Sequence, residues 1–167
     1  MYANNELIDA FPTPNDCDFS PWTGCAHRNI ETWQGINKLI VGVHCKIEKA
    51  NIENIAMLDT GAEWSIIGGK LAEKILEDKT LSIPAHIPIT LSTRLGKFTG
   101  NVHRIAVSLI AEKGRGHDLE VDGSFIIMPD WKGPMVLGFH GFLERILFAI
   151  DHGVSSQQQG YIYFAMP

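Results

Sequence analysis

One stretch of this chain constrains its fold more than any other, because a short polar break separates two apolar segments. Ile52–Leu58 is mainly apolar, Asp59-Thr60-Gly61 interrupts it abruptly, and apolar residues return within 64–67. Short apolar runs bounded by turn residues are typical of buried strands. Glycine lets the backbone approach closely, so a main-chain N–H near Gly61 can point at the neighbouring carboxylate. The segment therefore predicts two core strands whose connecting loop presents the carboxyl group of Asp59.

The rest of the chain repeats this pattern of short apolar segments between turn residues. Strands are predicted at 38–48, 87–91, 105–109, 121–128, 135–138 and 161–164, a helix at 69–78 and a shorter helical stretch at 141–147. The glycine-bearing segment 92–100 predicts the tip of a hairpin. Many short strands with one or two short helices are typical of a compact, barrel-like all-β domain.

Length and composition favour one globular domain with a flanking segment. The chain has 167 residues, of which 45% are hydrophobic and 20% are charged. This mixture is typical of globular proteins rather than disordered ones. The first 36 residues are rich in Pro, Asn and Asp and show no sustained periodicity. They predict an N-terminal extension, 1–36, that wraps the domain or stays mobile, followed by the domain itself at 37–167.

Charge and hydropathy argue against two classes of partner. The net charge is −5 and no cluster of Lys and Arg is present, so nucleic-acid binding is not expected. The apolar runs are too short to span a bilayer, so no membrane association is expected. The first ten residues include Glu6 and Asp9 and lack the features of a secretory signal, so a cytoplasmic location is expected.

The cysteines predict free thiols. The chain has three cysteines, Cys17, Cys25 and Cys45. An odd number of cysteines in a chain without a secretory signal favours free thiols over a disulfide framework. Together with His27 they match no spacing typical of a zinc site, so no metal is expected. No serine lies in a GxSxG-like segment, which argues against a Ser-His-Asp hydrolase.

An Asp-Thr-Gly triplet alone carries little information, but here its neighbours fit a longer pattern. The run Met57-Leu58-Asp59-Thr60-Gly61-Ala62-Glu63-Trp64-Ser65-Ile66-Ile67 matches apolar-apolar-Asp-Thr-Gly-Ala-x-x-Ser/Thr-apolar-apolar at every specified position. Val136-Leu137-Gly138 forms a second motif ahead of a helical segment at 141–146, and a hairpin segment at 91–103 lies between the two. These features resemble the retropepsins, the aspartic proteases of retroviral type. The closing segments at 148–151 and 161–164 resemble those of cellular and bacterial single-domain members, so the resemblance covers 37–167.

The resemblance implies a closed β-barrel of the acid protease type with a flap, a hairpin that closes over bound peptide. It implies that Asp59 is the catalytic carboxylate, in a loop completed by Thr60 and Gly61. The residues implied to line substrate subsites are Ala62, Glu63 and Trp64 beside the loop and Arg94, Leu95, Gly96, Lys97 and Phe98 in the flap. No cofactor is implied, and aspartic proteases need no metal.

The number of Asp-Thr-Gly loops predicts how the active site is completed. Asp59 is the only aspartate followed by Thr or Ser and then Gly. Aspartic protease chemistry needs two carboxylates that share a proton, so an identical chain is expected to supply the second across a two-fold axis. The predicted function is a homodimeric aspartic endopeptidase that acts on peptide or protein substrates. The alternatives are a catalytically silent peptide-binding or dimerisation module of the same fold, and an unrelated β-barrel that binds a ligand.

The second motif departs from the family at one place. After the glycine that corresponds to Gly138, many retropepsins have Arg and then Asp or Asn, whereas this chain has Phe139 and His140. In the family that Arg typically pairs with the acidic residue after the alanine, which is Glu63 here. His140 and Arg145 are the two candidates for a substitute partner.

Overall fold

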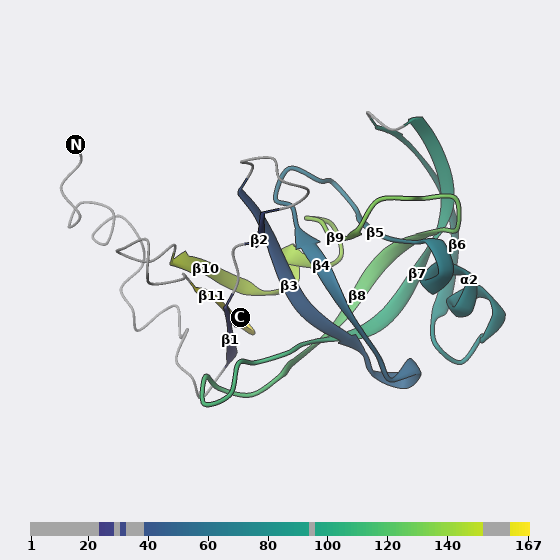
Figure 1. The fold of residues 1–167 in the computed structure, drawn as a ribbon. Coiled ribbons are helices and arrows are strands. Elements are labelled where there is room, and N and C mark those ends of the chain that lie inside the picture. The colour runs from purple at the N-terminus through teal and green to yellow at the C-terminus, as the bar shows by residue number, and fades with distance from the viewer. Residues whose placement is uncertain (1–23, 29–30, 33–38, 94–95, 152–160) are drawn as a thin grey trace.

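Most of the described chain lies in β-strands (Figure 1). The computed structural model describes residues 24–28, 31–32, 39–93, 96–151 and 161–167, so most of the predicted extension lies outside the described residues. The strands are β1 (Gly24–Arg28), β2 (Glu31–Thr32), β3 (Leu39–Ile47), β4 (Ile52–Leu58), β5 (Ser65–Gly68), β6 (Ile83–Thr93), β7 (Gly96–Leu109), β8 (Leu119–Met128), β9 (Met135–Leu137), β10 (Leu147–Asp151) and β11 (Tyr161–Ala165). The helices are α2 (Gly69–Glu77) and two single 3-10 turns, η1 (Glu48–Ala50) and η2 (Leu143–Arg145).

Six strands close into a barrel. Their hydrogen-bonded order is β3-β4-β9-β5-β8-β7, and β7 pairs back onto β3. In this closing pair, Cys45 lies opposite Leu109 and Ile47 lies opposite Val107. Because the barrel is closed, none of these six strands forms a free sheet edge along its paired segment. The prediction of an all-β barrel is thereby confirmed, with a single α-helix among the described residues.

The barrel interior is filled by side chains that alternate along the strands. In β8 the first residues alternate between buried and exposed, and the last four, 125–128, are all buried. Phe125 and Phe142 are fully buried and meet edge to face, with ring centroids 5.6 Å apart. Gly123 leaves room for this pair, because a Cβ there would lie 2.7 Å from the Phe142 ring. Each fully buried aromatic side chain stabilises the fold by about 1.5–3 kcal/mol.

A second sheet joins the two ends of the described chain. Its order is β1-β11-β10, with Gly24 opposite Ala165 and Arg28 opposite Tyr161. Ile162 of β11 is buried in the main core. One strand from the region predicted as an extension thus pairs with a closing strand of the domain, which sequence periodicity did not indicate.

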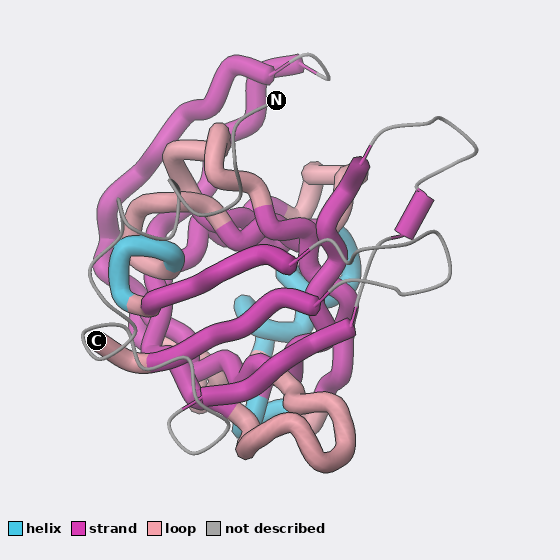
Figure 2. The backbone as a smooth tube through the Cα atoms, turned by 90° about the vertical axis from the view of Figure 1, so that its left-hand side faces the viewer, coloured by secondary structure: helices cyan, strands magenta, loops and turns pink. Residues whose placement is uncertain are grey.

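β6 and β7 form a long hairpin that rises beyond the barrel (Figures 1 and 2). The predicted tip at 92–100 is wrong in extent, because β6 continues to Thr93 and β7 begins at Gly96. Residues 94–95 lie outside the described residues. The hydroxyl groups of Thr90 and Thr99 lie 2.9 Å apart across the hairpin. Threonine favours extended backbone, which explains why polar residues continue the strands here.

The two helical predictions differ in outcome. The predicted helix at 69–78 is confirmed as α2 apart from its last residue. The stretch predicted at 141–147 is only the single turn η2. Gly141 has a φ of +76°, outside the helical range, and pairing with β11 begins at Leu147. No helix among the described residues has the length and apolar character needed to cross a bilayer.

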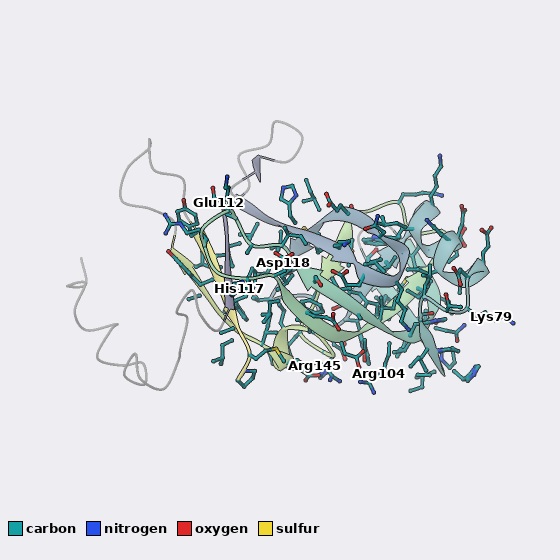
Figure 3. The ribbon with its side chains drawn as sticks, turned by 90° about the horizontal axis from the view of Figure 1, so that it is seen from below. Lys79, Arg104, Glu112, His117, Asp118 and Arg145 are labelled. Atoms are coloured by element: carbon teal, nitrogen blue, oxygen red, sulfur yellow. The ribbon has the colours of Figure 1, made fainter. Side chains whose placement is uncertain are left out.

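Two loops that carry charged residues, one between β7 and β8 and one after α2, lie at opposite ends of the described structure. Figure 3 shows Glu112 and Asp118, between β7 and β8, at one end and Lys79, just after α2, at the other. The Ala111 N–H donates to Asp118 Oδ1 at 2.8 Å, which holds the first of these loops together. The candidate site belongs to neither loop, because Asp59 follows β4.

Candidate active site

Three hydrogen bonds fix the Asp59 loop at the end of β4. The Asp59 N–H donates to the Leu137 carbonyl at 3.1 Å, and the Ala62 N–H donates to the Asp59 carbonyl at 3.1 Å. The Gly61 N–H donates to Asp59 Oδ1 at 2.9 Å. A Cβ at Gly61 would lie 3.3 Å from the same oxygen, so glycine leaves room for the carboxylate. The partly exposed Asp59 side chain is therefore oriented by its own loop.

The two sequence motifs meet in the sheet, because β9 lies between β4 and β5. β9 runs parallel to β4, with Val136 opposite Met57, and antiparallel to β5, with Val136 opposite Ile66. The Asp-Thr-Gly segment and the motif at 136–138 are therefore direct neighbours, although they are far apart in the sequence.

Ser65 joins β5 to the end of the second motif. Its side chain is fully buried, and its Oγ accepts a hydrogen bond from the Gly138 N–H at 2.9 Å. The same hydroxyl lies 3.5 Å from the Gly138 carbonyl, to which it donates. A side chain at Gly138 does not fit, because its Cβ would overlap the backbone of Trp64. The chain therefore passes close beside the Asp59 loop at this point.

Phe139 and His140 continue along the same loop. The Phe139 N–H donates to the Ala62 carbonyl at 2.8 Å, and the His140 N–H donates to the Glu63 carbonyl at 2.7 Å. The rings of His140 and Trp64 have centroids 5.4 Å apart. These contacts hold the segment after the second motif in a fixed position beside the segment after Asp59.

Of the two candidate partners for Glu63, the structure brings His140 close. Its Nε2 lies 3.9 Å from Glu63 Oε1, and its Nδ1 lies 3.5 Å from Glu144 Oε2. The Gly141 N–H donates to Glu144 Oε1 at 2.6 Å. This N–H first, and His140 beside it, lower the pKa of the Glu144 carboxyl from its ordinary value. Among the described ion pairs, none joins Arg145 to Glu63.

An apolar cluster lies between the Asp59 loop and the hairpin. Its buried members are Ile66, Val102, Ile126, Met128, Trp131 and Val136. Ala62 and Trp64 pack against this cluster from the loop, and Phe98 packs against it from the hairpin. Three of the residues predicted to line subsites therefore contact one apolar surface.

The other predicted site residues differ in where they lie. The exposed ones are Thr60, Gly61, Glu63, Gly96 and Lys97. Gly96 has a φ of +127°, a value that favours glycine, at the first position of β7. Arg94 and Leu95 lie outside the described residues.

Trp131 is a contact residue of the hairpin that sequence reasoning missed. Its ring meets Phe98 edge to face with centroids 5.2 Å apart, and its Nε1–H donates to the Pro134 carbonyl at 2.8 Å. Gly68 and Gly133 allow this position, because a Cβ at either would overlap the tryptophan ring. The signal in the sequence is a lone tryptophan among turn-forming residues, which is typical of a loop that packs on the domain.

Other chemistries find less support in the described residues. No group of three or more potential metal ligands occurs among them. Cys45 is buried, and burial raises the pKa of its thiol to about 12, so this thiol stays protonated and is a poor nucleophile.

A cavity of about 380 Å³ lies at the ends of β4 and β5 away from Asp59 and has no ionisable side chain in its lining. The lining residues are Asn54, Ile55, Gly68, Leu71, Gly133, Pro134 and Met135.

The described site offers one oriented carboxylate beside an apolar surface. Within the described residues no ion pair involves the Asp59 carboxylate, which leaves it available to a water molecule or a substrate. A carboxyl group in that position can exchange a proton with either. Comparison of this chain with models of known protein families and with curated proteins gave no match.

Proposed function

We propose that this protein is an aspartic endopeptidase of the retropepsin type, which hydrolyses peptide bonds as a homodimer with one Asp59 carboxylate from each copy. The observation that carries the proposal is the oriented Asp59 carboxyl group at the end of a core strand, with the Gly61 N–H 2.9 Å from its Oδ1. The motif at 136–138 lies beside this loop, and the hairpin packs on the same apolar cluster as the loop. The positions of strand, loop, second motif and hairpin support the proposal.

The mechanism follows from placing two such carboxylates side by side. Two carboxylates about 3 Å apart do not both ionise readily, so the pair holds one shared proton over the pH range between its two ionisation steps. The ionised member removes a proton from a water molecule held between them, and the protonated member donates its proton to the substrate carbonyl oxygen. The water oxygen attacks the carbonyl carbon. The C–N bond then breaks as the amine takes up the proton that the first carboxylate received from water, and the second carboxylate regains its proton from a hydroxyl group of the intermediate. The Gly61 N–H holds the carboxylate of its own chain in a fixed orientation.

Under this proposal an extended peptide would lie between the hairpin and the Asp59 loop. Its backbone would pair with strand edges, as an added strand does, and its side chains would contact alternate surfaces. Ala62, Trp64 and Phe98 contribute apolar surface on this side. Closure of the hairpin over the peptide would exclude water from the reacting groups.

The substitution Asp59→Asn tests the proposal. Asparagine retains the size and the hydrogen-bond acceptor but does not ionise, so we expect cleavage of a mixed peptide library to fall at least about 10³-fold between about pH 4 and pH 8. The thermal unfolding midpoint should change little, because Asp59 is partly exposed. Asp122→Asn is the matched control, since among the described ion pairs this exposed carboxylate pairs with exposed Arg104, and its activity should equal that of the wild type.

The alternatives predict other results. If wild type and Asp59→Asn are equally inactive while both are folded, the endopeptidase proposal is wrong. Binding of the same peptides by both proteins would then favour the silent peptide-binding module. Cleavage that persists in Asp59→Asn would assign the activity to another group.

A further inference from the structure

Phe139 is an exposed aromatic side chain beside the candidate active site. Its exposed fraction is 50%, and it is the only aromatic among the large hydrophobic side chains that are exposed in the described part of the chain. Its ring lies next to that of His140, with centroids 6.0 Å apart. Exposed aromatic side chains are uncommon on protein surfaces and are enriched at the centres of protein–protein contacts.

Backbone hydrogen bonds connect Phe139 to the Asp59 loop. Ala62 accepts a hydrogen bond from the Phe139 N–H and donates one to the Asp59 carbonyl, so a single residue joins the two. A two-fold axis that pairs two Asp59 carboxylates must pass beside this loop. Residues next to such an axis face the identical surface of the second copy. Phe139 therefore lies where a second copy has to approach.

The charges around Phe139 do not attract an identical surface. Glu63 and Glu144 are exposed and acidic, and His140 lies between them within the same chain. Arg145, the remaining charged neighbour, acts on Glu144 of its own chain. Exposed ion pairs contribute only about 0–1 kcal/mol, and like charges on two copies repel. Burial of apolar surface is then the main source of affinity that this part of the molecule offers.

We propose that Phe139 is the apolar centre of the contact between two copies of this chain, beside the paired Asp59 loops. The inference rests on the proposed function, because the site is incomplete until a second copy supplies its carboxylate. A contact of this kind depends on apolar burial. It should therefore persist at high salt and weaken when a charge is placed at position 139.

The first test is Phe139→Asp in the full-length chain, studied by sedimentation over a range of concentrations. We expect the dissociation constant of the dimer to rise at least about 30-fold, as is typical when a central aromatic contact is lost. Phe139→Leu keeps an apolar side chain and should retain most of the affinity. The matched control is Ile83→Asp, which places the same charge at a side chain with 65% exposure on β6 and should leave the dimer unchanged.

A second test does not require a destabilising charge. Phe139→Cys treated with a short bismaleimide should give covalent dimers at a higher yield than Ile83→Cys. The wild type, which contains Cys17, Cys25 and Cys45, gives the background yield. Circular dichroism of each variant shows whether its fold is retained.

The outcomes separate this inference from the proposed function. If Phe139→Asp stays as dimeric as the wild type, or Ile83→Asp dissociates the dimer instead, the inference is wrong even if peptide cleavage is observed. If the dimer depends on Phe139 and yet wild type cleaves no peptide, the inference stands and the proposed function is wrong. Dissociation of the wild-type dimer by high salt would also contradict an apolar contact.

Discussion

Few polar residues position the candidate site, and each has a defined partner. Gly61 orients the Asp59 carboxyl group through its N–H, and Ser65 orients the segment at Gly138 through its hydroxyl. Buried polar groups need such partners, because an unpaired one loses its hydrogen bonds with water on folding. At the residue scale, the geometry of the site therefore depends on single hydrogen bonds that substitutions can remove one at a time.

Ser65→Ala should destabilise the protein by about 1–3 kcal/mol, because the buried Gly138 N–H loses its acceptor. Chemical denaturation of both proteins measures the difference in the free energy of unfolding. Ser92→Ala removes an exposed hydroxyl and should change the stability by less than about 0.5 kcal/mol. Equal stability of Ser65→Ala and the wild type would show that the Gly138 N–H finds another acceptor.

His103 should make the stability depend on pH. Its Nδ1 lies 2.8 Å from the Ser82 Oγ, and burial first, with His86 nearby, lowers the pKa of its imidazole. The unfolded chain then binds a proton more readily than the folded chain. The contribution of this group is present above the unfolded pKa of about 6.5 and is lost as pH falls through the lower folded value.

Urea unfolding between about pH 7.5 and pH 5 measures this effect. His103→Gln should flatten the fall in stability within this window, whereas His117→Gln at an exposed position should not. The lowered pKa of the Glu144 carboxyl acts at lower pH, below about 4.5, so the two effects are separable. An unchanged slope in His103→Gln would assign the pH dependence to another group.

At the scale of elements, the β6–β7 hairpin combines an exposed strand with an apolar inner surface. β6 lies at the edge of its sheet, and most of its residues are exposed. Pro84 and Pro88 lack an N–H, which makes this edge a poor template for another strand. Leu91 and Phe98 pack instead against the cluster that includes Trp131. The hairpin is therefore attached to the barrel beyond its base mainly by apolar side chains.

Phe98→Ala should loosen the hairpin without unfolding the barrel. The edge-to-face contact with Trp131 contributes about 0.5–1.5 kcal/mol beyond burial. Amide hydrogen exchange should accelerate at 90–93 and 96–99, and KM for peptides should rise more than kcat falls. Ser92→Ala, at an exposed position of β6, should change neither the exchange rates nor KM. Equal exchange rates in Phe98→Ala and the wild type would show that this contact does not hold the hairpin.

At the scale of the whole molecule, the barrel is complete within one chain whereas the proposed active site is not. The pairing of β3 with β7 closes the barrel. The Asp59 loop, in contrast, supplies one carboxylate where the chemistry needs two. Folding and the proposed catalysis should therefore respond differently to chain concentration, because only the proposed active site requires a second copy.

Mixing wild type with Asp59→Asn tests this sharing. After exchange of subunits in an equal mixture, half of the wild-type chains pair with an inactive partner, so activity should fall to about half. Addition of the active Asp122→Asn chain in the same amount should not lower it. Unchanged activity after Asp59→Asn is added, with exchange verified, would show that each chain carries a complete site.

The sequence alone predicted the local elements close to their observed bounds. β4, α2 and the glycine-oriented Asp59 loop were predicted because periodicity, turn residues and glycine act over a few neighbouring positions. The hairpin tip and the helical stretch at 141–147 were predicted poorly. Their extent depends on strand pairing with distant segments, which local propensity does not encode.

Only the tertiary structure decided which distant residues meet. It closed the barrel between β3 and β7, placed β9 between β4 and β5, and brought Phe98 onto Trp131. It also paired β1 with β11 and set His140 rather than Arg145 beside Glu63. The physical reason is that these contacts join segments far apart along the chain, so they depend on how the whole chain packs and not on the preferences of neighbouring residues.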